Sequence, residues 1–411
     1  MLSSAPSIAQ TETNETGGDR RAAIQELLDR RAAAVIERDV DSFMATVSAA
    51  SAEFRARQKR LFEWMGDVPF RSYRLRAVWE RAGDLIRPSD RGRYPGAEDA
   101  ALPVTEELYR IAGVDTAPAI EDLFYTFVKE DGQWLVAGDG DLDDLGLHTA
   151  RHMWDFGPVD LTQEGRFLVI EHPCRRKRPC GELPAGFFSL AAQALDRVGR
   201  FWNSPAGDTI VVLVPSSDKE LGRMLQVTFD TANFVAFAYS TVDVRRGYDF
   251  TAPRIVFNYK SLANRSDESV LGILAHELLH VVTRRASGPF TPVFIEEGFA
   301  DYVGNDANLA SLAFLSAEIG AGRFDRRLPQ DFEFIVGDGT SIFRNYQKSH
   351  SAVRFFVERW GLDEFVRFYR NLGRREIAAG TARYQLNDAL KDAVGLSLRE
   401  FEQAWADSIG S

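Results

Sequence analysis

The sequence contains few of the residues that crosslink chains or bind metals, with two cysteines and six histidines among 411 residues. Cys174 and Cys180 lie close together, and outside the cytosol such a pair can form a disulfide that closes a short turn. A metal site built from these cysteines and His172 would lack a second pair of ligands. The cysteines alone therefore assign no function, and whether they pair is left open.

Two further absences exclude classes of protein. No run reaches the roughly 18 apolar residues that a membrane-spanning helix needs. The net charge is −11, which argues against a nucleic-acid partner because such a partner requires a basic face. The beginning of the chain lacks the basic and apolar regions of a signal peptide. The small residues at 2–10 nevertheless resemble the tail of a trimmed export signal, so we expect a secreted or surface-tethered protein.

The apolar content of 45% is ordinary for a globular protein, and the length corresponds to about two to three domains. The order of helical and strand patterns predicts an α+β fold. We expect a disordered leader over residues 1–19, a first α+β domain over 20–140, a linker over 141–165 and a second domain over 166–411.

The first domain is predicted to place helices before antiparallel strands. Asp41 or Ser42 is a candidate N-cap of its second helix, and Asp131-Gly132 favours a hairpin turn between its last two strands. Helices are expected at 21–37, 39–47 and 54–64, and strands at 73–79, 108–113, 123–129 and 134–138.

This order of elements, with the meander around Asp131-Gly132-Gln133-Trp134, resembles the nuclear transport factor 2-like (SnoaL-like) superfamily over roughly residues 20–140. The resemblance implies a curved antiparallel sheet wrapped on helices, which forms a cone with a pocket. Such domains serve as enzymes, ligand binders or interaction modules, so the fold alone gives no function. His148 and His152 lie four apart, as metal ligands on a helix can, but surface or packing roles are favoured because no third ligand is near.

The second domain is predicted to alternate strands and helices and then to become helical. Strands are expected at 167–171, 209–214, 234–242 and 254–259, and helices at 187–202, 218–226, 266–284, 295–304, 309–319, 343–360, 362–372, 384–394 and 397–409.

One motif in this domain, His276-Glu277-Leu278-Leu279-His280, predicts catalysis. Residues four apart share a helix face, so His276 and His280 can point two imidazoles at one ion. Zinc accepts nitrogen ligands and keeps an open position in catalytic sites. Glu277 lies beside the first ligand, where its carboxylate can take a proton from an activated water. Such a string also occurs by chance, although six histidines make a chance match improbable here.

A second motif, Glu296-Glu297-Gly298-Phe299-Ala300-Asp301-Tyr302, offers the remaining parts of a metal site. We predict Glu297 as the third ligand. Asp301, four residues later on the same helix face, can accept the free N–H of a ligand histidine and fix its orientation. Glu296 is the weaker candidate because Ala300 stands at that offset.

Together the two motifs resemble gluzincin metallopeptidases of the thermolysin and aminopeptidase N type, in particular the peptidase MA-like branch, over about residues 166–411. The resemblance implies a zincin fold with a small mixed sheet, an HExxH helix and a helical C-terminal subdomain. It also implies one Zn²⁺ held by His276, His280 and Glu297, with Glu277 as general base. The Gly and third His of metzincins are absent after His280. The Gly-x-Met-Glu-Asn motif of aminopeptidases is also absent, which favours an endopeptidase.

Family members place a Tyr or His opposite the zinc to stabilise the oxyanion. Tyr346 corresponds to that position, with His350 as second choice. The expected partner is a peptide or protein substrate. The alternative is a catalytically inactive, protease-like scaffold whose N-terminal pocket domain binds a ligand or a partner.

Overall fold

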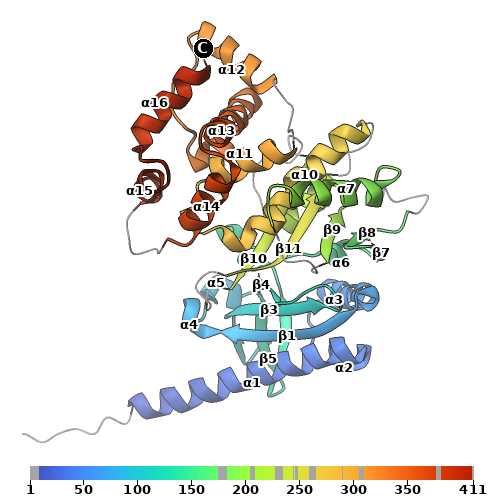
Figure 1. Ribbon diagram of the computed structural model, residues 1–411. Coiled ribbons are helices and arrows are strands. Elements are labelled where there is room, and N and C mark those ends of the chain that lie inside the picture. The colour runs from blue at the N-terminus through green and yellow to red at the C-terminus, as the bar shows by residue number, and fades with distance from the viewer. Residues whose placement is uncertain are drawn as a thin grey trace, which may run out of the picture.

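The computed structural model confirms the α+β class (Figure 1). In the described part of the chain no helix combines the length and the hydrophobicity needed to span a membrane. The structure describes residues 9–174, 183–203, 209–226, 235–243, 245, 249–258, 265–288, 290–304, 310–375 and 381–409.

The N-terminal unit consists of helices packed on antiparallel strands, as predicted. The strands are hydrogen-bonded as two three-stranded sheets, β1-β3-β4 and β2-β5-β6, rather than as one continuous curved sheet. The helices of this unit are α1 (Ala9–Glu37), α2 (Val40–Met44), α3 (Ala52–Trp64), α4 (Trp79–Ala82) and α5 (Pro88–Arg91), with a 3-10 turn at Met65–Asp67. The strands are β1 (Phe70–Val78), β2 (Asp99–Ala101), β3 (Val104–Ile111), β4 (Ala119–Leu123), β5 (Thr126–Glu130) and β6 (Gln133–Gly138).

Several details of this unit differ from the prediction. Helix α1 begins at Ala9, so residues 9–19 of the expected leader are helical, and residues 1–8 lie outside the described residues. The N-cap of α2 is Asp39, whose carboxylate accepts the backbone N–H groups of Asp41 and Ser42. The strand predicted over 123–129 is divided between β4 and β5.

The predicted hairpin turn between β5 and β6 is confirmed. Asp131 and Gly132 have φ values of 48° and 76°, which is the left-handed backbone that a two-residue hairpin turn requires.

A five-stranded mixed sheet forms the centre of the second unit, in the order β10-β11-β9-β8-β7. Its inner pairs β8/β9 and β9/β11 are parallel, and its outer pairs β7/β8 and β10/β11 are antiparallel. The strand β7 lies inside the segment predicted as a linker, which also contains a 3-10 turn (Asp143–Leu145) and α6 (Met153–Phe156). The strands are β7 (Asp160–Glu164), β8 (Phe167–Glu171), β9 (Ile210–Val214), β10 (Ala236–Asp243) and β11 (Asp249–Phe257).

The helices of the second unit begin and end close to the predicted residues. They cover one face of the sheet and then gather in a helical C-terminal region (Figure 1). They are α7 (Phe187–Gly199), α8 (Asp218–Leu225), α10 (Asp267–Thr283), α11 (Val293–Gly304), α12 (Ala310–Gly320), α13 (Gly339–Trp360), α14 (Leu362–Gly373), α15 (Ala382–Val394) and α16 (Leu398–Ile409), with 3-10 turns at Arg284–Ala286 and Asp331–Phe334.

The inner strands of the five-stranded sheet are buried on both faces, and each face is covered by a different unit. Side chains alternate between the two faces of a strand. In β8, Phe167 and Val169 join the core formed with α7 and α10, whereas Leu168 and Ile170 join the core of the N-terminal unit. The N-terminal unit is therefore the cover of one sheet face rather than a separate body on a linker.

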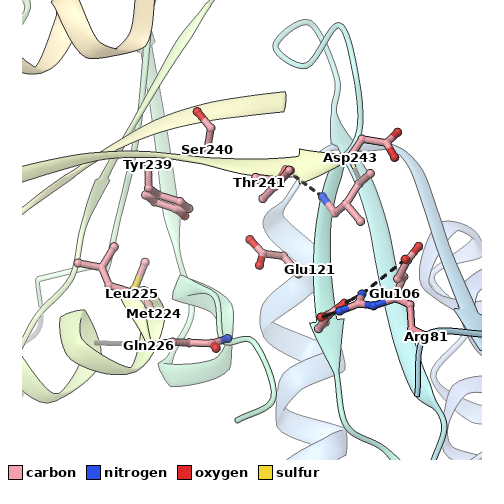
Figure 2. A pocket seen from close by; sticks show the side chains of 13 residues that line it. Arg81, Glu106, Glu121, Met224, Leu225, Gln226, Tyr239, Ser240, Thr241 and Asp243 are labelled. Atoms are coloured by element: carbon pink, nitrogen blue, oxygen red, sulfur yellow. Dashed lines mark hydrogen bonds and ion pairs between the residues drawn. The ribbon is translucent and has the colours of Figure 1, made fainter. Parts of the chain in front are cut away.

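Polar contacts also hold the N-terminal unit against this sheet. Arg254 of β11 and Asp115 of the N-terminal unit are both buried and form an ion pair of 2.8 Å. The hydroxyl of Thr241 accepts the backbone N–H of Ile120 at 3.1 Å. Beside this contact the units enclose a cavity of about 460 Å³, into which Glu121 points (Figure 2). Burial raises the pKa of Glu121 to about 7.

Candidate metal centre

Helix α10 positions the histidine motif against the sheet. Ser266 caps its first turn by accepting the backbone N–H of Ser269, and two acidic residues follow in that turn, where they complement the helix dipole. Apolar residues occupy almost every side of the helix, so α10 is buried between the sheet, α7 and α11. A helix held on all sides gives its polar side chains fixed positions.

Two of these side chains, His276 and His280, form a cluster with Glu297 of α11. The Nε2 atoms of His276 and His280 lie 3.2 Å apart. One carboxylate oxygen of Glu297 lies 3.2 Å from the Nε2 of His276 and 3.5 Å from the Nε2 of His280. Among the residues that the structure describes, this is the one group of three or more metal-binding side chains whose ligand atoms converge.

Asp301 of α11 contacts one histidine of the cluster. The Nδ1 of His276 is 2.9 Å from a carboxylate oxygen of Asp301. When Nδ1 carries the proton that bonds to Asp301, the lone pair of the neutral ring lies on Nε2. Nε2 is the atom that faces His280 and Glu297. Although burial alone favours the neutral ring, hydrogen bonds to Asp301 and Glu297 hold the pKa of His276 well above its usual value. Burial opposes the charge on Glu297, but the two histidines lower its pKa below the usual range.

Two glycines explain how α11 comes close enough to supply Glu297 and Asp301. A Cβ added to Gly304 would lie 2.7 Å from the backbone oxygen of Gly272 in α10. A Cβ added to Gly298 would lie 2.4 Å from the backbone oxygen of Ser349 in α13. Since real Cβ atoms do not approach that closely, a larger residue at either position would push α11 away from its neighbours.

Glu296, the neighbour of the predicted ligand, faces away from the cluster. Its carboxylate lies 3.7 Å from the guanidinium of Arg284. Burial raises the pKa of Glu296, and Arg284 partly offsets this. The two adjacent glutamates thus have different surroundings, and Glu297 is the one that meets the histidines.

Glu277 is buried beside the cluster, with 7% of its surface exposed. Burial raises the pKa of its carboxyl, and the nearby histidines work in the opposite direction. The backbone of Ala238 in β10 lies within hydrogen-bonding reach of the carboxylate. This contact with the edge strand of the sheet was not visible in the sequence, because 39 positions separate the two residues and no motif links them.

Tyr346 and His350 lie on α13, which packs on α11. Burial raises the pKa of the Tyr346 hydroxyl, and the negative charges of Glu297, Asp301 and Glu277 raise it further, so this side chain lies near the cluster. The ring of Tyr346 also packs edge-on against Phe334, with centroids 5.3 Å apart. His350 is buried, and burial lowers its pKa.

The remaining histidines are paired one to one with acids. His148 contacts Asp143 at 3.0 Å on the surface. The other two are buried, His152 with Glu107 and His172 with Glu220, each at 2.6 Å. Cys174 is disulfide-bonded, and Cys180 lies outside the described residues.

The cluster fits a tetrahedrally coordinated ion. A zinc ion with nitrogen and oxygen ligands at about 2.0–2.2 Å requires those atoms to lie about 3.3–3.5 Å from one another. The three measured separations are 3.2, 3.2 and 3.5 Å. Two imidazoles and one carboxylate form a donor set that zinc takes in catalytic sites, where the fourth position stays open.

Comparisons with known proteins add little to this geometry. No family model and no curated protein matches the chain. Among solved structures, a two-domain M1 zinc metallopeptidase, determined as a mutant bound to L-arginine, is similar over 77% of this chain with 13% sequence identity and a TM-score of 0.35. The match spans 62% of the length of that protein. Similarity at this level carries no argument about function.

Proposed function

We propose that this chain is a zinc-dependent peptidase of the gluzincin type, acting as an endopeptidase. The observation that supports the proposal most strongly is the triangle of His276, His280 and Glu297, whose edges of 3.2–3.5 Å suit one zinc ion. Asp301 supports it independently, because a carboxylate on the far nitrogen of a ligand histidine is a usual feature of zinc sites.

When bound, zinc would supply Lewis acidity that polarises a carbonyl and lowers the pKa of water to about 7. The side chains of this chain supply the proton transfers. Glu277 is next to the cluster and buried, and burial raises the pKa of its carboxyl, which favours a group that accepts a proton and then returns it. Asp301 holds the ring of His276 in orientation.

We assign Tyr346 the role of oxyanion donor. The negative charges of Glu297, Asp301 and Glu277 raise the pKa of its hydroxyl, which supports a position near the cluster. The N-terminal unit is proposed to be SnoaL-like, and its role here is to cover the sheet that supports α10. The disulfide at Cys174 supports an extracytoplasmic location, since disulfides persist in oxidising compartments.

The test combines zinc content with cleavage of a peptide library. The wild-type protein is expected to bind one zinc ion and to cleave internal peptide bonds. Glu277→Gln should keep the zinc and lose activity by about 10²–10⁴-fold. Glu296→Gln is the matched control, because it removes a half-buried carboxylate that is adjacent in sequence and lies 3.7 Å from Arg284.

Two results would contradict the proposal. If saturating zinc does not bind, the metal assignment is wrong. If zinc binds but no peptide is cleaved in a manner that depends on Glu277, the inactive scaffold is the better interpretation.

A further inference from the structure

A cavity of about 400 Å³ at one end of the five-stranded sheet is lined by five arginines. They come from four places in the chain: the turn before β8, the end of α10, the last turn of α14 and the residue that follows α14. No Asp or Glu occurs among the described residues that line the cavity, although the chain as a whole carries a net charge of −11. The arginines are Arg166, Arg284, Arg285, Arg370 and Arg374.

Two of these arginines stack on aromatic rings. The guanidinium of Arg370 lies 4.4 Å from the ring centre of Trp202, and that of Arg284 lies 4.1 Å from the ring centre of Phe250. The Nε atoms of both are buried without a hydrogen-bond partner. The nearest acid to Arg284 is Glu296, at 3.7 Å. Stacking fixes the planes of the guanidinium groups and leaves donors unused.

The ends of two helices explain part of this clustering of arginines. The C-termini of α10 and α14 carry partial negative charge, which favours nearby cations. That attraction is worth only about 0.3–1 kcal/mol for each exposed group, so the helix ends alone do not account for five arginines around one cavity.

The cavity wall is also rigid. Gly373 at the end of α14 approaches the loop after α10 so closely that a Cβ on it would lie 1.8 Å from the backbone oxygen of Ala286. This contact fixes the end of α14 that carries Arg370 against the end of α10 that carries Arg284. Arg285 is held separately by a hydrogen bond of 3.1 Å to the hydroxyl of Thr116. A preformed arrangement of donors loses little entropy on binding.

We propose that this cavity binds a small phosphate monoester. Guanidinium groups pair with phosphate through two parallel hydrogen bonds, and a dianionic phosphate can accept bonds from several arginines at once. The volume exceeds the need of a phosphate alone and falls in the range of small-molecule pockets, about 300–1,000 Å³. Apolar wall residues such as Phe250, Pro253 and Val282 offer contact to an organic group. The inference does not depend on the proposed peptidase activity.

The test measures binding of phenyl phosphate by titration calorimetry at constant ionic strength, with inorganic phosphate and succinate as comparison ligands. The intact protein should bind phenyl phosphate saturably, inorganic phosphate more weakly, and succinate weakest. Arg370→Gln and Arg374→Gln should each weaken phenyl phosphate binding by about tenfold or more. Arg374 is exposed, so its variant tests the cavity even if Arg370→Gln disturbs folding.

Arg359→Gln is the matched control, because Arg359 is also exposed and stacks on a tryptophan, Trp360, at 5.2 Å but lies outside the cavity. It should bind phenyl phosphate as the wild type does. Three outcomes would overturn the proposal. One is no saturable binding, and another is equal binding by all variants, as expected if the probe occupies the metal centre instead. The third is tighter binding of succinate than of phenyl phosphate, which would assign the cavity to carboxylates.

Discussion

His152 is buried and His276 is half-buried, and each has a carboxylate within 3 Å, but their partners are arranged differently. His152 has its Nε2 2.6 Å from Glu107 and stacks on Trp154, with ring centres 4.7 Å apart. Although burial favours the neutral ring, Glu107 raises the pKa of His152 to about 9. A proton between the two groups satisfies both of them.

No such pairing satisfies the cluster around His276. Its Nδ1 already contacts Asp301, and its Nε2 lies equally close to the Nε2 of His280 and to Glu297. The Nε2 atoms of His276 and His280 face each other at 3.2 Å. A single proton cannot form hydrogen bonds from both of these nitrogens to the one carboxylate of Glu297. Convergence of three donors, rather than burial or a nearby acid, therefore distinguishes the candidate metal centre from an ion pair.

The largest expected effect is on zinc affinity, which should depend on the cluster around His276 and not on the His152 pair. His280→Ala removes one of the three proposed zinc ligands and should weaken zinc binding by about 10³-fold or more, roughly a third of the free energy of a protein zinc site. His152→Ala should leave zinc affinity unchanged. Competition with a chromophoric chelator measures both. Equal losses of zinc affinity in the two variants would contradict the assignment of the metal to the cluster around His276.

Removing one partner of the His152 pair should instead affect stability. His152→Gln leaves Glu107 buried without its cation, and breaking a buried ion pair costs about 3–5 kcal/mol of unfolding free energy. The double variant His152→Gln/Glu107→Gln should recover part of the loss, because no uncompensated charge remains. Urea unfolding of the metal-free protein measures these differences. A loss below about 1 kcal/mol in the single variant would show that the pair is not an ion pair.

The same pair predicts a pH dependence. The pKa of His152 rises from 6.5 to about 9 on folding, so the folded state binds the proton more tightly. Its contribution, about 3 kcal/mol, is complete below pH 6.5 and is lost as the pH rises through about 9. Urea unfolding at pH 6.5 and pH 9.5 should show this decrease in wild type and not in the double variant. A decrease of the same size in both would assign it to other groups.

The smallest effect concerns the orienting carboxylate. Asp301→Asn keeps the shape of the side chain but removes the charge that holds His276, and should lower zinc affinity by about 10–100-fold. Chelator competition is again the measurement. Unchanged affinity would mean that Asp301 does not orient a ligand.

Much of the fold could be predicted from local pattern. The capped, apolar segment at Ser266 predicted α10 to within one residue at its beginning, and the apolar run at 167–171 predicted β8 completely. The three-residue strand β2 was missed because so short a segment cannot show the alternation of apolar and polar residues that predicts a strand. The division of the antiparallel strands into two sheets depends on pairing between distant segments, which one sequence does not reveal.

The candidate site shows the same limit. Offsets of four residues on a helix were enough to select His276, His280, Glu297 and Asp301, because helix geometry fixes which side chains share a face. Contacts between elements were not accessible in this way. The buried pair of Asp115 and Arg254 joins residues 139 positions apart, and the five arginines of the cavity come from separate turns and helix ends.

The most direct test of the metal centre is anomalous diffraction at the zinc absorption edge from crystals of the zinc-loaded Glu277→Gln variant. We predict one strong peak at a point within bonding distance of the Nε2 atoms of His276 and His280 and of the Glu297 carboxylate. A zinc peak held by other residues, or none within the triangle in zinc-saturated crystals, would contradict the account.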